Sequence, residues 1–508
     1  MKPNFAELPE SYETIRRAAK SLLKGVRLSE SEALEIWNQL SGGAEPTPAK
    51  LAEVQHAIAK HYGFATWAAL KTSYLAQTAR LTPLDEWARQ IVKRLHGEGW
   101  ERPQPKRAGS MIPLRPELAS HSPLGAVLCS DLDALKRFNP APDGEYEVDL
   151  LCVACALPGL SEEQTPRALA CAQWLLDRGF AVNRTSGAPM FEGVPMPPLY
   201  YAAGVANSPE LTAELLARGA EPNDNESLYH SMEFADTRCT ELLLKAGAEP
   251  FSMVIFRALD FADPARIRVL LDHGADPNAC GHDQSPMHWG LKSKCPLEVF
   301  RLLLEAGADP TSQDGHGNSA RELAIWLHRN DVVDLIDQHR GASEEPTRSK
   351  EEAYVLAVMN GRRAIRPTEP LSGKAVHVLP ILARHGDLVA VRRLLEAGWP
   401  ADASEPSLGT ALNHAAFSGD PEMAKLLLEF GANWAEKNAY GGDAWGSIYW
   451  ASRNLGTDAG VGRHVEVARV FLEAGSPVPD VVDASEEVED FVDAWLAEHP
   501  DWPRAELS

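Results

Sequence analysis

One short pattern recurs along this chain and limits what the chain can fold into. In its clearest copy, residues 409–433, a helix-forming run (411–417) is followed by a polar turn and a second apolar run (423–430), which Gly431 ends. Glycine enters the left-handed conformation at a helix C-terminus without the Cβ clash that other residues meet. Two helices this short cannot bury their apolar faces alone, so the pattern predicts copies of the module stacked side by side.

The other copies share a leucine-rich stretch that ends in glycine. Successive glycines Gly247, Gly274 and Gly307 are 27 and 33 residues apart, and Gly398 to Gly431 is again 33. Each of these stretches matches the second helix of the module, with apolar residues at adjacent and i+4 positions. The full set of ending glycines is Gly179, Gly219, Gly247, Gly274, Gly307, Gly398, Gly431 and Gly475. Degenerate copies in phase predict an all-α fold built from repeats.

The chain here resembles the ankyrin-repeat family, whose period is 33 and whose first helix opens T-P-L-H-x-A. The matching stretches are SPMHWG at 285–290, PLYYAA at 198–203 and TALNHA at 410–415. The resemblance implies an all-α ankyrin-repeat solenoid of about ten or eleven modules over residues 112–480, and a non-enzymatic role in protein–protein interaction. It also implies that His288, at the histidine position of the motif, hydrogen-bonds backbone and ties adjacent turns together.

The strength of the pattern divides the chain into five parts. We expect a helical N-terminal region that ends in a polar linker, a first sub-array, a segment that is either a degenerate repeat or a joint, a second sub-array, and an acidic capping helix. These parts are 1–110 (with the linker at 101–110), 111–342, 343–374, 375–480 and 481–508.

The N-terminal region is helical by periodicity but lacks the repeat spacing. Residues 51–71, LAEVQHAIAKHYGFATWAALK, resemble a short leader found ahead of repeat arrays and glyoxalase-like domains in bacterial proteins. Two structural interpretations stay open: a helical cap that covers the first repeat, or a helix-turn-helix DNA reader. A third hypothesis places an enzymatic or regulatory activity here, although no catalytic constellation supports it.

Charge is distributed unevenly over the 508 residues, whose formal net charge is −23. Residues 1–110 carry 16 basic and 12 acidic residues, whereas the rest carries 33 and 60. An acidic body disfavours nucleic acid, because phosphate binding needs basic surface. A basic protein partner fits this balance, and one specific form is an immunity-like inhibitor of a basic toxin or nuclease. The alternative is that the acidic charge serves solubility alone.

The sequence favours a reducing, cytoplasmic compartment. The first ten residues are polar and no apolar segment of a signal peptide follows them. The longest uncharged apolar run, 150–160, is too short to span a bilayer, so no membrane association is expected. The seven cysteines are scattered and odd in number, which does not suggest a disulfide framework.

We expect no metal, no cofactor and no catalytic residue. Zinc bound by Cys280, His282, His288 and Cys295 is disfavoured, because their spacings of 2, 6 and 7 match no compact site. The C-x-x-C pair at 152 and 155 lies in an apolar run, where small buried cysteines serve helix packing. Phosphate-loop, dinucleotide-binding, H-E-x-x-H and G-x-S-x-G patterns are absent from the sequence.

Aromatic side chains are the candidate partner-binding residues. In this architecture the turns and first helices line a concave surface, where aromatic residues are the expected anchors of protein recognition. Packing between repeats is the alternative role for each of them. The candidates in turns are Trp399, Trp434 and Tyr440. Those in or at the end of first helices are Trp289, Phe417, Tyr449 and Trp450. Tyr200 and Tyr201 lie beside the long loop 185–198.

Overall fold

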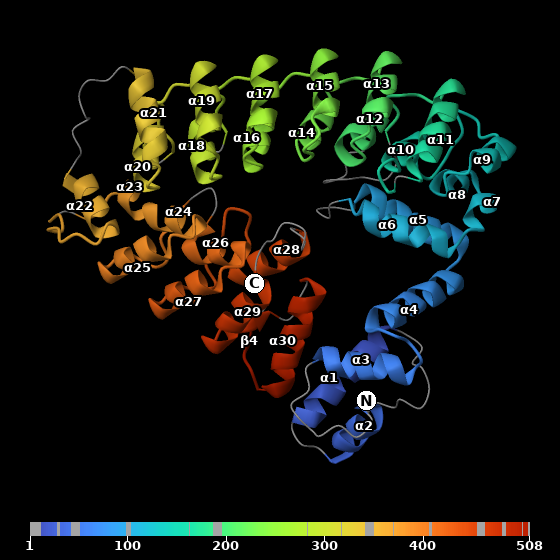
Figure 1. Cartoon of the computed structure of the whole chain (residues 1–508), viewed down its shortest axis with the longest axis horizontal. Helices are drawn as coiled ribbons and strands as arrows, with labels where there is room; N and C mark the ends of the chain where they lie inside the picture. Colours follow the sequence, from blue (N-terminus) through green and yellow to red (C-terminus); the bar gives the residue numbers. More distant parts are fainter. Residues whose placement is uncertain are drawn as a thin grey trace. The chain divides into compact units, whose positions relative to one another are not determined.

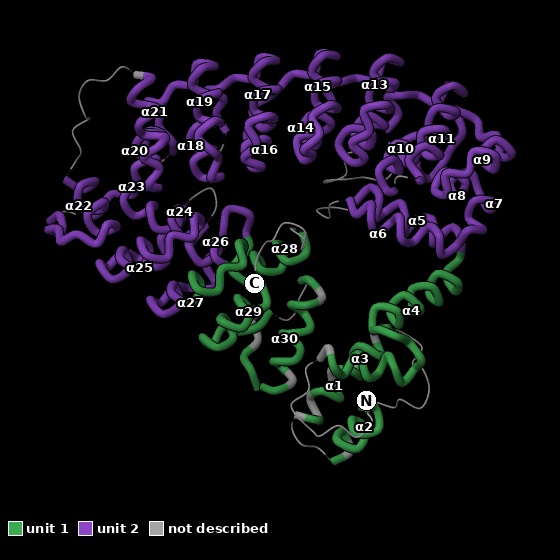
Figure 2. The backbone as a smooth tube through the Cα atoms, in the orientation of Figure 1, with its two compact units in different colours: residues 1–83, 416–425, 442–508 green, residues 84–415, 426–441 purple. Residues whose placement is uncertain are grey.

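A computed structural model describes most of the chain and divides it into two compact units. Unit 1 comprises residues 1–83, 416–425 and 442–508, and unit 2 comprises residues 84–415 and 426–441 (Figure 2). The described residues are 12–27, 31–41, 51–97, 103–161, 163–185, 196–281, 283–315, 317–340, 350–368, 370–405, 409–454, 463–479, 484–499 and 501–505.

Helix pairs form the central part of unit 2, as the repeat pattern predicts. First helices pack on the next first helix (α16 on α18, α18 on α20), and second helices do the same (α17 on α19, α19 on α21) (Figure 1). The pairs are α10 Leu150–Ala156 with α11 Thr165–Asp177, α12 Pro198–Tyr200 (continued by η2 Tyr201–Val205) with α13 Pro209–Ala217, α14 Ser227–Ser231 with α15 Arg238–Lys245, α16 Ser252–Asp260 with α17 Pro264–Asp272, α18 Pro286–Lys292 with α19 Leu297–Glu305, and α20 Ala320–Trp326 with α21 Asn330–Arg340.

The eight glycines identified in the sequence all adopt the left-handed conformation. Their φ angles lie between 85° and 96°, which confirms their assignment as helix C-caps. At Gly274, for example, no atom lies within 4 Å of an added Cβ, so the requirement for glycine there comes from the backbone angle alone.

Asparagines four residues after a capping glycine tie consecutive turns together. Each Nδ2 donates to the carbonyl of the next capping glycine, and each Oδ1 accepts from a backbone N–H two residues beyond that glycine. The pairs of distances are 3.0 and 2.9 Å for Asn183, 3.1 and 2.8 Å for Asn223, and 2.9 and 2.7 Å for Asn278. This recurring bond gives the loops between modules a fixed spacing.

The start of unit 2 differs in one respect from the sequence expectation. The sequence predicts a polar linker over 101–110, yet Pro105 begins helix α6, whose Ala108 and Met111 are buried. Proline is well suited to the first turn of a helix, and α6 packs on α5. The elements here are α5 Leu84–His96, α6 Pro105–Met111, η1 Ile112–Leu114, α7 Leu118–His121, α8 Pro123–Leu128 and α9 Leu132–Phe138. Helix α5 also packs on α8 and α10, so it covers the first repeats.

In the weakly patterned segment 343–374, the structure describes 350–368 and 370–374. Helix α22 (Lys350–Met359) packs on α25, as second helices do elsewhere in the array. Whether the segment is a degenerate repeat or a joint stays a prediction. The following elements are α23 Gly373–Val376, α24 Val378–Arg384, α25 Leu388–Glu396, the antiparallel strands β1 Ser404–Glu405 and β2 Gly409–Thr410, α26 Ala411–Ser418 and α27 Pro421–Glu429.

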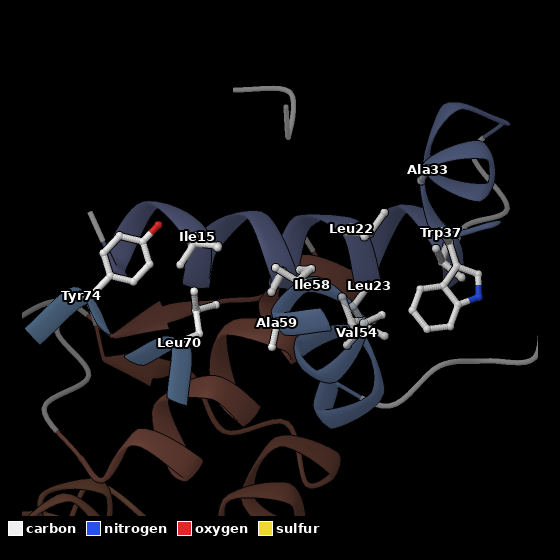
Figure 3. Close-up of a cluster of buried hydrophobic side chains, with 13 residues drawn as sticks. Ile15, Leu22, Leu23, Ala33, Trp37, Val54, Ile58, Ala59, Leu70 and Tyr74 are labelled. Atoms are coloured by element: carbon white, nitrogen blue, oxygen red, sulfur yellow. The ribbon is translucent and has the colours of Figure 1, made fainter. Parts of the chain in front are cut away.

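Unit 1 combines the N-terminal helices with the end of the chain. Helices α1 Tyr12–Arg27, α2 Ser31–Ser41, α3 Leu51–His61 and α4 Trp67–Leu81 enclose a core that includes Ile15, Leu22, Val54, Ile58 and Leu70 (Figure 3). The later elements are α28 Ala444–Asn454, α29 His464–Glu473, α30 Glu486–Glu498, and the parallel strands β3 Val478–Pro479 and β4 Arg504–Ala505. Helix α30 packs on α29 and on α1, where Arg16 Nη1 lies 3.4 Å from Asp490 Oδ1.

Candidate interaction surface

Three of the candidate aromatics are almost completely buried. Tyr200 and Tyr201 expose 1% and 0% of their surface, and Tyr201 stacks on the His96 ring at 4.1 Å. Trp399 exposes 3%, donates its Nε1–H to the Ala375 carbonyl at 2.9 Å and stacks on Tyr354. These side chains present almost no surface to a partner, and packing between repeats, the alternative role, explains them.

Phe417 and Trp450 form an exposed aromatic pair in unit 1. Phe417 lies at the end of α26 and Trp450 lies on α28, and their rings stack at 5.7 Å with an interplanar angle of 15°. Each side chain is 41% exposed. His464 Nε2 donates to the Phe417 carbonyl at 3.1 Å, and Asn454 Nδ2 donates to the Trp450 carbonyl at 2.8 Å. The backbone on both sides of the stack is therefore held in place.

The remaining candidates do not join this pair. Tyr449, next to Trp450, is 9% exposed and packs on Trp445, so it belongs to the core of unit 1. Trp434 and Tyr440 lie in the turn after the Gly431 cap, in unit 2. Trp434 is half-buried, and Tyr440 is 78% exposed.

A polar network that sequence reasoning missed begins on the first helices of unit 2. His230, at the end of α14, lies 3.2 Å from Glu226 and 3.1 Å from Glu233. Burial alone would lower the pKa of His230, but its hydrogen bonds to these carboxylates outweigh burial and raise the pKa. Arg257 Nη2, on α16, lies 2.5 Å from Glu233 Oε1, so the network links two consecutive repeats.

Trp289 extends this network to α18 and is covered there. Its Nε1–H donates to Asp260 Oδ1 at 2.9 Å, and its ring packs edge-on against Phe256. The Arg384 guanidinium, from α24, lies over the Trp289 ring at 5.8 Å from its centroid, and Trp289 is 8% exposed. Trp289 is therefore not an exposed binding residue on a concave surface, because Arg384 from a later repeat lies over its ring.

The sequence contained a signal for this network. His230 and Arg257 each lie 17 residues before a capping glycine, and Trp289 lies 18 before the next one. Equivalent positions of successive repeats are neighbours in space, so aligning the modules on their glycines would have brought these residues together.

His288 ties adjacent turns, as the resemblance implied. The side chain is fully buried, and its Nε2 lies 2.9 Å from the Asn318 carbonyl while Nδ1 lies 2.8 Å from Ser285 Oγ. A carbonyl can only accept, so Nε2 carries the proton and Nδ1 accepts from the serine hydroxyl. Burial lowers the pKa of His288, which keeps the imidazole neutral.

The cysteines give no sign of a chemical site among the described residues. Cys152 and Cys155 are fully buried on α10, and burial raises the pKa of the Cys155 thiol. Cys295 is buried, whereas Cys280 is exposed, and His282 of the zinc alternative lies outside the described residues. Within those residues, no group of three or more His, Cys, Asp or Glu side chains could hold a metal ion.

None of the described helices is long and apolar enough to cross a membrane.

A match to one family model agrees with the repeat geometry. Residues 379–428, which span α24 to α27, match the family model described as "Ankyrin repeats (many copies)". The chain is similar to a solved structure, the ankyrin repeat domain of Bcl-3, described as a unique member of the IkappaB protein family. Identity is 20% and the TM-score is 0.22, with 46% of this chain and 97% of that chain covered. No curated protein matches the chain. The stacked helix pairs, their glycine caps and the matched residues together make this chain an ankyrin-repeat protein.

Proposed function

We propose that this chain is a non-enzymatic interaction protein that binds a basic protein partner through the exposed Phe417–Trp450 stack. The observation that carries the proposal is that stack: two large rings, each 41% exposed and packed face to face on anchored backbone. Ankyrin repeats are in general protein–protein interaction modules, and exposed aromatic residues on rigid elements are typical binding hot spots.

The stack offers a useful amount of binding free energy. A Phe or Trp side chain buries about 150–250 Å² when fully covered, so covering the exposed part removes roughly 80 Å² per ring from water. At about 25 cal/mol per Å² this contributes about 2 kcal/mol per ring. Because the two rings already hold each other, little side-chain entropy is lost when a partner binds.

Charge supports a basic partner. Residues 409–508, which contain both rings, carry 6 Lys and Arg against 18 Asp and Glu. A positively charged partner would be steered towards this part of the chain, and the association rate would fall as salt screens the attraction.

The test compares three variants of the full chain. Partners are captured from the cells that make the protein, identified by mass spectrometry, purified, and titrated against wild type, F417A, W450A and L81A. Leu81 is 77% exposed and lies in the same unit, so it is the matched control. We expect F417A and W450A to weaken binding by about 10- to 100-fold, L81A to leave it unchanged, and the partner to be basic. Equal affinity of all four proteins, or a partner with an acidic surface, would remove the proposal.

The excess of acidic over basic residues also favours a more specific function, the inhibition of a basic toxin or nuclease. Its distinguishing result is that the purified partner has nuclease or toxin activity and loses it when wild-type protein, but not W450A, is added.

The hypothesis of an activity in the N-terminal helices is tested by assaying residues 1–110 for turnover and DNA binding. We expect neither, because the packing of α1 on α30 supports a structural role for this region.

A further inference from the structure

Strands β1 and β2, here called the finger, reach the first helix of a distant repeat within unit 2 through Glu405. Strand β1 pairs with β2 in the loop before α26, and Glu405 of β1 forms an ion pair with Lys292 of α18. The two side chains are 113 residues apart in sequence and only 1% and 2% exposed. A solenoid module normally contacts its immediate neighbours, so a contact that skips residues 297–377 needs its own explanation.

Several other groups converge on this ion pair. Arg384 lies over the Trp289 ring, and His385 hydrogen-bonds the backbone of Lys292. Burial would raise the pKa of Glu405, but the attraction and hydrogen bond of Lys292 lower it below its ordinary value, so Glu405 is ionised. Asp260 also attracts Arg384. Without Glu405, Lys292 and Arg384 would lose the carboxylate that attracts both of them, and Asp260 would be the acidic group left near Arg384.

The contact is polar and incompletely satisfied, unlike the apolar contacts between neighbouring repeats. Four of its covered polar atoms have no hydrogen-bond partner among the described residues: Glu405 Oε2, Arg384 Nη1, His385 Nε2 and His414 Nε2. A buried ion pair is often no more stable than apolar packing of the same size, and each unpaired polar group costs free energy. The apolar spine is equally buried, for example at Leu270 and Leu303, but its side chains have no polar groups to satisfy. We therefore expect the opening of this contact to cost less free energy than the unfolding of the repeats.

We propose that the Glu405 finger is an intramolecular latch: it occupies a carboxylate-binding site formed by Lys292 and Arg384, and it gives way to an acidic side chain of a partner. The chemistry of recognition is a carboxylate that pairs with the Lys292 ammonium and is attracted by the Arg384 guanidinium. This site does not depend on the Phe417–Trp450 proposal and can be tested without knowing any partner.

The test uses full-length E405A with acetate as the probe carboxylate. Opening is measured by hydrogen exchange over residues 286–292 and by the rate at which an amine-reactive ester labels Lys292. We expect both to rise by about tenfold or more in E405A, the equivalent of about 1.4 kcal/mol. Sodium acetate should restore protection in E405A, and sodium chloride at the same ionic strength should not.

Two further variants separate a latch from general destabilisation. E405L fills the space with an apolar group, so acetate should have no effect on it. K292M/E405L replaces the pair with apolar packing and should protect residues 286–292 at least as well as wild type. Unchanged exchange in E405A, equal effects of acetate and chloride, or an equal rise in the remote helices α13 and α17 would each overturn the proposal.

Discussion

Replacing His288 by alanine tests how the turns of the array are held together. The side chain is fully buried and bridges Ser285 on its own module to the Asn318 carbonyl on the next. Truncation removes both of these hydrogen bonds, although the Asn318 carbonyl keeps the bond that it accepts from the Asp314 N–H at 2.9 Å. The two lost bonds cost about 1–3 kcal/mol together, and the lost packing of the ring raises the total to about 2–5 kcal/mol. His273, exposed on the preceding module, is the matched control, and H273A should change stability by less than about 0.5 kcal/mol.

The assay is urea unfolding combined with hydrogen exchange. Stability in a repeat array is a sum of nearest-neighbour terms, so the loss of protection in H288A should be greatest around residues 285–292 and 314–320 and should fade towards α13. A loss below about 0.5 kcal/mol, or one spread evenly over unit 2, would refute the role assigned to this histidine.

Three further outcomes follow from buried or constrained positions. Burial lowers the pKa to about 3 for three histidines of unit 2, which are His96, His385 and His414. Unfolded chain protonates such residues near pH 6.5 while the fold keeps them neutral. Stability should therefore fall as pH drops below about 6.5, by up to about 1.4 kcal/mol per pH unit for each, and a melting temperature that rises between pH 7 and pH 5 would contradict this. At Gly125 an added Cβ would lie 2.0 Å from the Leu118 carbonyl oxygen. G125A should thus cost more than about 3 kcal/mol by thermal unfolding, against about 1–2 kcal/mol for G274A, where only backbone strain opposes the change; equal costs would refute this ranking. Iodoacetamide should label exposed Cys280 in the native protein and buried Cys155 only after unfolding, and rapid native labelling of Cys155 would contradict its core position.

The repeat fold could be predicted because each module carries its own local signals. Gly274 and Gly307 mark where second helices end, and the T-P-L-H-like opening at 285–290 marks where a first helix begins. These signals depend on neighbouring residues alone. The helix at 105–111 was missed because its polar composition suggested a loop, and its helical state depends on burial of Ala108 and Met111.

The candidate surface was less predictable, because exposure depends on contacts between distant residues. Sequence position could not distinguish Phe417, which is exposed, from Trp289, which Arg384 covers from nearly one hundred residues away. The Lys292–Glu405 pair had no local signal, since neither residue belongs to a motif. Its formation depends on how the array curves, and that curvature is a property of the whole stack.

The most direct test of the account places a photo-crosslinking amino acid at Ser418, an exposed position beside Phe417, in the otherwise native chain. A second protein carries it at Lys425, an exposed position on α27, as the control. Crosslinking in the producing cells should give one basic protein at position 418. We expect this product to be lost in the W450A background and to be much weaker at position 425. The same product at both positions, or a product that survives W450A, would contradict the claim that the aromatic stack is where this protein meets its partner.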